Sequence, residues 1–361
     1  MPFKKLLAIM LAAGLLTGCS DQRVVNEIHI VQTMGLDALK QGLNCTVLIG
    51  SFKKKGETDL QALSTAADSM YEIVPRLNVM AKHRIEYGQL GMVLFGQSYA
   101  ERGIGTVLES LCRNPKISSS LMLGVTDTTA SELLAKTRKS RDAYYLHGMI
   151  EQNVKNGNLP RNNLQTAIFN YFGEGRDLFL PHFKLDGEDI RIDGLALFRD
   201  DKMMATMEIR KAFFLKLMMQ NTKNGHILVP LAGAGNTEDP YIQFTSAGSK
   251  AVYRLNRLKP TPSVRIDVRL HAQAKQYPAS VDFESIEQVA RLEKDTGVYI
   301  EKELRKVVAF CQTNGVDPAG IGDFVRSKSN NWSAEQFRAI YPKMEVNVNV
   351  DFTIVQPVLT Q

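Results

Sequence analysis

The N-terminal segment decides where the rest of this chain folds. Lys4 and Lys5 precede an apolar run over residues 6–16, and Cys19 follows shortly after small residues. A basic start, a short apolar stretch and small residues at its end are the three regions of a secretory signal peptide. The apolar run is far shorter than the roughly 20 residues that a membrane-spanning helix needs. We therefore expect residues 1–18 to be a signal peptide that is removed on export.

The end of this segment resembles a bacterial lipobox, formed by Leu16, Thr17, Gly18 and Cys19. In such a motif the cysteine sulfur receives a diacylglyceryl group, and cleavage leaves Cys19 as the first residue. Two acyl chains anchor a protein stably, whereas one chain alone is marginal. We expect the protein to be held by lipid on the outer face of the cell membrane. The alternative is an ordinary secreted protein with a cysteine at this place by chance.

Length and composition predict a multi-domain globular body. A chain of 361 residues without its signal still exceeds one ordinary domain. Hydrophobic residues make up 44% and charged residues 23%, as in typical globular proteins. The formal charge is +6, and the basic residues are interspersed with acids. The absence of a dense basic tract excludes nucleic acid as the expected partner.

Three cysteines follow the lipobox at wide spacing, with no C-x-x-C pair: Cys45, Cys112 and Cys311. A disulfide framework needs more cysteines and an even number of them. A single bridge and free thiols are the two alternatives. Cys45 and Cys311 fall in apolar periodic stretches, which favours buried free thiols there.

Strands and helices alternate in the first part of the chain, which predicts a mixed α and β domain. The predicted elements are a hairpin over 29–51, a helix from Thr58-Asp59 to Pro75, strands over 89–95 and 121–125, and helices over 104–111 and 128–135. Asn, Gly and Pro then cluster over 153–187, which indicates a loop-rich junction. We expect an N-terminal domain region over 19–187 and a C-terminal region over 188–361, with a further division near 260.

The second part predicts a long helix against an antiparallel sheet. A hairpin over 195–209 is expected to turn at Asp200-Asp201. Strands with one buried face are predicted over 264–271 and 346–354, where apolar and polar residues alternate. Between them lies a helical pattern over 283–314 that includes Ile286; Asp282 is placed to cap its start and Gly315 its end, while Gly297 is a weak point within it. The expected class is α+β, multi-domain, with mixed and antiparallel sheets packed against helices.

Local motifs for catalysis or cofactors are missing from the sequence. The six histidines are scattered, and neither a G-x-S-x-G nor an H-E-x-x-H motif occurs. Ser51 with Lys54 matches S-x-x-K by chance, and Ala232–Asn236 is interpreted as a surface loop rather than a phosphate site. The acidic run from Asp186 to Asp193 lacks the oxygen spacing of a calcium loop. We expect no enzyme activity, no cofactor and no metal site, and we assign no ligand-binding residues.

The order and spacing of several short segments resemble one known family over nearly the whole mature chain. The segments are Gly18-Cys19 with Asp21, Arg23 and Glu27; Met34–Asp37; Gly91–Gly96 with Ala100 and Gly103-Ile104; Arg113–Pro115; Asp193–Lys202; Gly315–Asp317; and Tyr341-Pro342. The family is Ger(x)C, the lipoprotein C subunits of the nutrient germinant receptors of bacterial spores. One departure is Ser20, where the family often has Trp after the lipidated cysteine.

This resemblance implies three mixed α and β domains without enzymatic activity. It also implies a location on the spore inner membrane, beside two integral-membrane receptor subunits of the A and B type. The expected function is that of a non-catalytic receptor subunit needed for nutrient-triggered germination. A substrate-binding lipoprotein of a transporter is the alternative, although such proteins usually contain repeated βαβ halves. An exported hydrolase is a third and weaker hypothesis.

Overall fold

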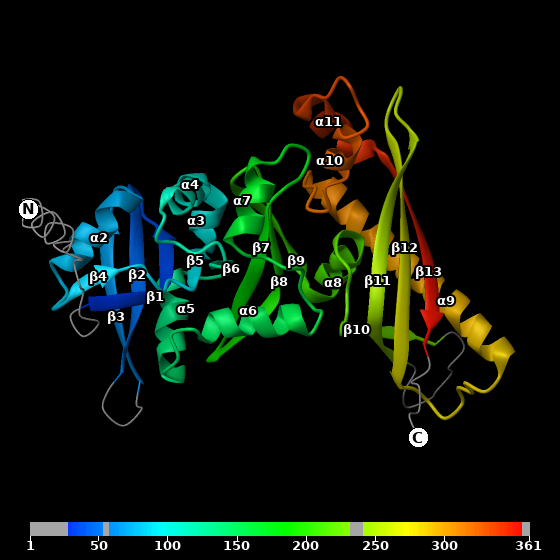
Figure 1. The fold of residues 1–361 in the computed structure, drawn as a ribbon, viewed down its shortest axis with the longest axis horizontal. Helices are drawn as coiled ribbons and strands as arrows, with labels where there is room; N and C mark the ends of the chain where they lie inside the picture. Colours follow the sequence, from blue (N-terminus) through cyan, green and yellow to red (C-terminus); the bar gives the residue numbers. More distant parts are fainter. Residues whose placement is uncertain (1–27, 53–57, 232–240, 356–361) are drawn as a thin grey trace, which may run out of the picture.

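The chain folds into an elongated molecule of sheets and helices (Figure 1). This computed structural model describes residues 28–52, 58–231 and 241–355. The N-terminal strands form one end of the long axis, and a second sheet with a long helix forms the other. Two separate sheets, each packed with helices, confirm the predicted α+β class.

The larger sheet contains all described strands up to residue 208 and has the order β3-β2-β1-β5-β6-β7-β8-β9, with β4 paired to β1. Its strands are β1 (Ile28–Ala38), β2 (Leu43–Phe52), β3 (Thr58–Ala67), β4 (Arg84–Glu86), β5 (Met92–Gly96), β6 (Met122–Thr126), β7 (Phe179–Asp186), β8 (Asp189–Arg199) and β9 (Lys202–Glu208). Strands β1, β5, β6 and β7 run parallel, and antiparallel hairpins flank them on both sides.

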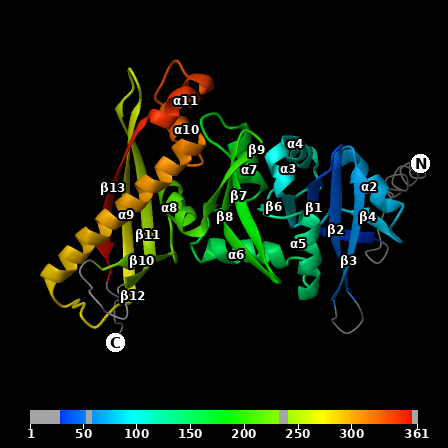
Figure 2. The same ribbon diagram turned by 180° about the vertical axis from the view of Figure 1, so that it is seen from behind.

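Helices cover both faces of this sheet (Figures 1 and 2). One face carries α2 (Met70–Asn78), α3 (Gln97–Arg102), α4 (Gly105–Arg113) and α7 (Leu164–Phe172); the other carries α5 (Ala130–Thr137), which continues into the short η2 (Arg138–Ser140), and α6 (Tyr145–Lys155). Strand β5 is apolar throughout because both of its faces are buried. Val93 and Phe95 enter one core, while Met92 and Leu94 enter the other, because successive side chains of a strand point to opposite faces.

The helix α8 (Ile209–Met219) lies between the two sheets and contacts β8, β11 and the long helix α9. Its residues from Ala212 to Met218 are all buried. Because neighbours surround it, its sequence has no polar face. Lys216 is the one charged residue in this run, and its Nζ lies 3.4 Å from the carbonyl oxygen of Val154, to which it donates. Burial lowers the pKa of Lys216 to about 8.

The second sheet has the order β10-β11-β12-β13. Its strands are β10 (His226–Pro230), β11 (Tyr241–Arg257), β12 (Ser263–Gln276) and β13 (Glu345–Ile354). The long helix α9 (Ile286–Asn314) crosses one face, and α10 (Ile321–Arg326), α11 (Ala334–Ile340) and the short η3 (Tyr341–Lys343) follow it. The apolar side chains of β12 at 264, 266, 268 and 270 are buried as predicted.

The direction of the last strand was predicted wrongly. β13 runs parallel to β12, from Ser263 opposite Glu345 to Ala272 opposite Ile354, so this sheet is mixed rather than antiparallel. The reason is the connection, because α9 carries the chain back along the sheet before β13 begins. A helical crossover of this kind joins parallel strands, whereas a short turn joins antiparallel ones.

The helix predicted from Thr58 to Pro75 was also wrong. Residues 58–67 form β3, which pairs with β2 over its whole length, and α2 begins only at Met70. Leu60 and Ala67 are buried, so the three- and four-residue spacing came from an edge strand whose pairing with β2 outweighed local periodicity. Pro75 lies inside α2 instead of ending it.

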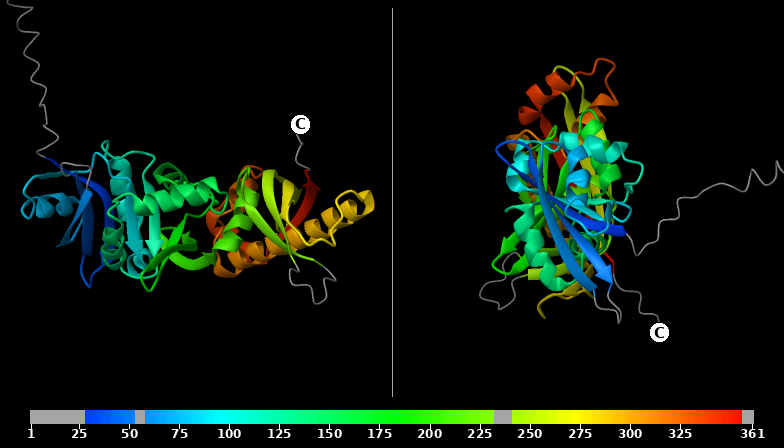
Figure 3. Two further views of the ribbon diagram at one scale, coloured as in Figure 1. Left: turned by 90° about the horizontal axis from the view of Figure 1, so that it is seen from below. Right: turned by 90° about the vertical axis from the view of Figure 1, so that its left-hand side faces the viewer.

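Several turns and caps match the sequence patterns. β1 and β2 form the predicted hairpin, and β8 and β9 turn at Asp200, which has a φ of 56°. Gly315 ends α9 with a φ of 62°, as predicted. The start of α9 differs, because Ser285 rather than Asp282 accepts the capping hydrogen bond. Ile286 is 88% exposed, since this end of α9 projects beyond the sheet (Figure 3).

Both sheets continue across the expected domain boundaries. Residue 187 lies in the turn between β7 and β8, and residue 260 lies in the turn between β11 and β12. The loop-rich stretch over 153–187 contains α7 and β7 in addition to loops. The predicted surface loop at 232–236 and Lys54 of the S-x-x-K match lie outside the described residues.

Candidate functional site

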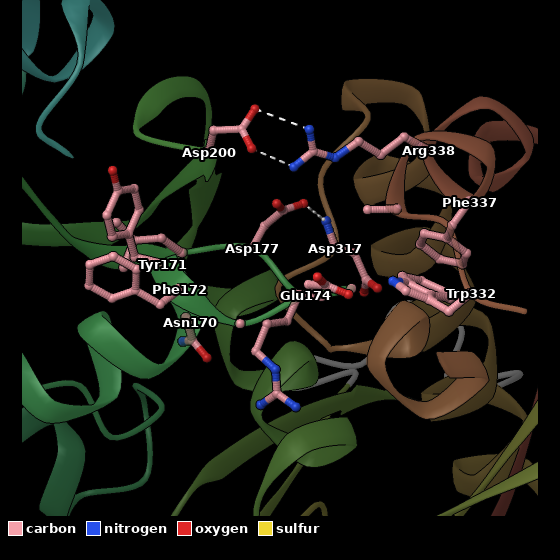
Figure 4. Close-up of a pocket in the computed structure, with 15 residues that line it drawn as sticks. Asn170, Tyr171, Phe172, Glu174, Asp177, Asp200, Asp317, Trp332, Phe337 and Arg338 are labelled. Carbon is pink, nitrogen blue, oxygen red and sulfur yellow. Dashed lines mark hydrogen bonds and ion pairs between the residues drawn. The ribbon is translucent and has the colours of Figure 1, made fainter. Parts of the chain in front are cut away.

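A cavity of about 220 Å³ lies at the junction between the larger sheet and the C-terminal helices (Figure 4). We call it the junction cavity. Four separate segments line it: residues 170–178 at and after the end of α7, the turn at Asp200, the segment around Asp317, and residues 332–338. Side chains cap both helices that position these residues: Asn163 accepts a hydrogen bond from Thr166 N at 2.9 Å, and Ser333 accepts one from Gln336 N at 3.2 Å.

Asp177 and Asp317 join the two sides of the junction. The main-chain N–H of Asp177 donates to the carbonyl oxygen of Asp317 at 3.0 Å, and the N–H of Asp317 donates to Oδ2 of Asp177 at 2.6 Å. Nearby, Asp323 N donates to the carbonyl oxygen of Gly175 at 2.6 Å. Gly175 has a φ of 76°, and a Cβ there would lie 2.5 Å from Asp323 N, so this close approach requires glycine.

Asp317 is 3% exposed, and only one of its two carboxyl oxygens accepts a hydrogen bond from the described residues. Its Oδ2 accepts a hydrogen bond from Gly322 N at 2.7 Å, whereas its Oδ1 is buried without a partner among the described residues. Burial raises the pKa of Asp317 to about 7 and that of Asp177 to about 6. The site therefore holds two carboxyl groups that titrate near neutral pH.

The two arginines of the cavity are already paired. Arg338 Nη1 donates to Oδ2 of Asp200 at 3.2 Å, with a second, shorter contact to Oδ1, and Arg176 pairs with Asp323. The Arg176 guanidinium also lies 4.2 Å from the centre of the Phe169 ring. Both arginine side chains that line the cavity are therefore already ion-paired with aspartates.

Aromatic rings form one wall of the cavity. The centroids of Trp332 and Phe337 are 5.3 Å apart, and Phe337 is at the same distance from Tyr341. The Nε1 of Trp332 is buried and has no hydrogen-bond partner in the described part of the chain. Figure 4 shows the nitrogen edge of this indole facing the side where the carboxyl groups of Asp317 and Glu174 lie.

These groups can bind a molecule. Among the described residues, no histidine, serine or cysteine lines the cavity. Among residues 28–52, 58–231 and 241–355, no cluster of three His, Cys, Asp or Glu could hold a metal ion. In the acidic run, Glu188 is exposed and paired with Lys136 and Lys139.

The lipobox residues Leu16, Thr17, Gly18 and Cys19 lie outside the described residues. Cys45 and Cys311 are buried free thiols, as predicted, and Cys112 is free and exposed. In the described part of the chain, no helix is both long and apolar enough to cross a membrane.

Segments that carried the family resemblance converge at the junction. Asp200, from the segment 193–202, and Asp317, from 315–317, both line the cavity. The neighbouring Asp201 accepts a hydrogen bond from Gly105 N at 3.3 Å. Sequence reasoning did not find Asp177, Arg338 or Trp332. The sequence signal near Asp177 was the Gly173-Glu174-Gly175 turn, which ends two residues before it and indicated a loop rather than a ligand site.

The sequence matches two family profiles that together cover most of the chain. Residues 21–185 match the family described as "Spore germination protein N-terminal domain". Residues 193–357 match the family described as "Spore germination B3/ GerAC like, C-terminal".

Complete relatives give the same result. The chain is 25% identical to the spore germination protein GerQC of Bacillus cereus over 361 residues, covering 99% of this chain and 100% of that protein. It is 21% identical to the spore germination protein KC of Bacillus subtilis (strain 168), covering 90% of this chain and 88% of the relative. The crystal structure of the GerBC protein has the same fold, with a TM-score of 0.56, 14% identity, and coverage of 90% of this chain and 97% of that one.

The two family matches define a spore germination protein with two characteristic parts. The chain belongs to the Ger(x)C family, and its role is in spore germination. This family is not a known enzyme family.

Proposed function

We propose that the chain is a non-catalytic lipoprotein subunit of a membrane germinant receptor, required for nutrient-triggered germination. It acts beside two integral-membrane subunits, of the A and B type, on the outer face of the spore inner membrane. A lipid on Cys19 is its anchor.

One observation supports this proposal most strongly. The match to the spore germination families starts at residue 21, directly after the lipobox that ends at Cys19. An exported, tethered body with this family's two parts fits a subunit that docks on membrane partners. Tethering raises the effective concentration of the body at the membrane surface without requiring new contacts.

Two measurements on spores test the anchor and the partners. Mass spectrometry of the mature N-terminal peptide should find Cys19 as the first residue, with acyl chains on it. Affinity purification of the chain from detergent-solubilised spore membranes should recover two polytopic membrane proteins. An unmodified Cys19, or purification of the chain alone under mild detergent, contradicts the proposal.

The transporter alternative has less support from the fold. The larger sheet contains a run of parallel strands, but the second sheet contains a single parallel pair, β12 with β13, beside antiparallel strands. The two parts of the chain are therefore not repeated βαβ halves.

A further inference from the structure

We propose that the junction cavity binds a small organic ammonium ion that also carries a hydrogen-bond acceptor. This site is independent of the membrane anchor and of the receptor partners. Three features of the described residues support it, namely the charge balance, the unpaired polar atoms and the aromatic wall.

The charge balance of the cavity favours a cation. Its lining contains four carboxyl groups and two guanidinium groups. Arg338 is paired with Asp200, and Arg176 is paired with Asp323, which lies outside the lining. Glu174, Asp177 and Asp317 are left without an ion pair in the described part of the chain. A positive ligand would supply the charge that the protein does not.

The unpaired polar atoms define what the ligand must offer. Asp317 is 3% exposed, and its Oδ1 is an acceptor that receives no hydrogen bond from the described residues. The Nε1 of Trp332 is a buried donor without an acceptor. Leaving such groups unsatisfied is costly, and no hydrogen bond joins the two atoms to each other. A molecule with an N–H group at one end and an oxygen at the other would satisfy both.

The aromatic wall suits the same ligand. Trp332 and Phe337 line the cavity together with the carboxyl groups, and the nitrogen edge of the indole faces those groups (Figure 4). The N–H at this edge can donate a hydrogen bond to an acceptor on the ligand. Carboxyl groups on one side and rings on the other favour an ammonium ion over a bare metal ion, for which the described residues provide no cluster.

Ethanolamine is the simplest probe with both groups, and Trp332 provides the signal. Trp332 is the only tryptophan of the chain, so its fluorescence, excited selectively over that of the 11 tyrosines, reports on this cavity. The full chain is purified in detergent and titrated at pH 8, where Asp317 is ionised, with ethanolamine, ethylene glycol or glycolate. We expect saturation with ethanolamine alone, at a dissociation constant on the order of 1 mM, the range open to so few heavy atoms.

Two substitutions assign the binding to the cavity. Asp317→Asn should weaken ethanolamine binding at least tenfold, and Glu174→Gln, at an exposed position, should weaken it about threefold, because each removes one charge. Asp351→Asn, which removes an exposed carboxylate on β13, should bind like the parent chain. If Asp317→Asn does not fold by circular dichroism, Glu174→Gln carries the test.

The proposal is overturned by any of three results. These are no saturation with ethanolamine, an equal midpoint with ethylene glycol, and parental affinity in both Glu174→Gln and a folded Asp317→Asn. A negative result in this titration does not bear on the measurements of the lipid anchor and the membrane partners, so the ligand-site proposal can be wrong while the proposed function holds.

Discussion

Asp177 and Asp317 are hydrogen bonded to each other twice across the junction, although 140 positions separate them in the sequence. One bond joins the two main chains, and the other brings the carboxylate of Asp177 to the N–H of Asp317. Asp177 precedes β7 of the larger sheet, while Asp317 follows α9 of the C-terminal part. This pair therefore fixes the second part of the molecule against the first.

Removal of the Asp177 carboxylate should destabilise the junction. In Asp177→Ala, the buried N–H of Asp317 loses its acceptor, which costs about 1–3 kcal/mol in the free energy of unfolding. Asp177→Asn keeps an oxygen in the same place and should cost less than half as much. Urea unfolding followed by Trp332 fluorescence measures both. Equal losses in the two variants would show that the hydrogen bond is not the cause.

Stability should depend on pH through the same two carboxyl groups. Their pKa values of about 6 for Asp177 and about 7 for Asp317 lie above the ordinary value of 3.8, chiefly because of burial. At a pH between the ordinary pKa value of 3.8 and these raised values, the two carboxyl groups are protonated in the folded state and ionised in the unfolded state. The free energy of unfolding contributed by these groups is therefore complete below pH 3.8 and falls as the pH rises to about 7.

The variant Asp317→Asn tests which part of this pH-dependent loss of stability comes from Asp317. The groups that face Asp317 electrostatically include Asp177, Tyr341 and Cys311, and backbone N–H groups of 320–322 partly offset its burial. Without the Asp317 carboxyl group, the decline should end near pH 6, where Asp177 has titrated. Asp351→Asn serves as the control. Identical pH profiles for Asp317→Asn and the parent chain would contradict the assignment.

Two glycines of α9 should respond in opposite directions to alanine. Gly315 has a left-handed φ of 62°, so Gly315→Ala should cost about 1–2 kcal/mol. Gly297 lies within the helix, and an added Cβ would meet Val350 O at 3.6 Å and Phe352 Cβ at 3.8 Å, both ordinary contacts. Gly297→Ala should therefore stabilise by about 0.5–1 kcal/mol. Thermal unfolding of the pair measures the sign, and destabilisation by both would mean that α9 packs more tightly than described.

The thiols should differ sharply in reactivity. Cys45 is 0% exposed and Cys311 is 3% exposed, and burial raises the pKa of both thiols. Because the thiolate is the reactive form, iodoacetamide should modify Cys112 in the native protein and the other two only in urea. Peptide mass spectrometry identifies the sites. Early modification of Cys45 would indicate that its core opens readily.

Much of the fold was predictable where a strand or helix has one buried face. The alternating strand at 264–271 and the long helix with its Gly315 cap are examples. Local sequence patterns did not predict the structure where contacts with several neighbouring elements outweigh the local periodicity. The helix α8 has no polar face because both sheets surround it, and the helical spacing at 58–67 belongs to an edge strand paired with β2. The direction of β13 depended on the crossover through α9, which no local signal encodes.

The candidate site was predictable only in part. Asp200 and Asp317 belong to segments that resemble the family, but the resemblance assigned neither residue to a binding site. Asp177 and Trp332 come from stretches without any motif, and only the fold brings them to one cavity. The lipobox shows the opposite case, because a short local pattern predicts its chemistry while Cys19 lies outside the described residues.

The nutrient response of spores tests the central claim most directly. The strain should lack the gene for this chain and its paralogues, and it should be complemented with the parent chain or with Cys19→Ala. Germination is followed by the loss of optical density after nutrients are added. We predict a lost response in the deletion, full rescue by the parent chain and weak rescue by Cys19→Ala, which should also leave the membrane fraction. An unchanged nutrient response in the deletion strain would contradict the account.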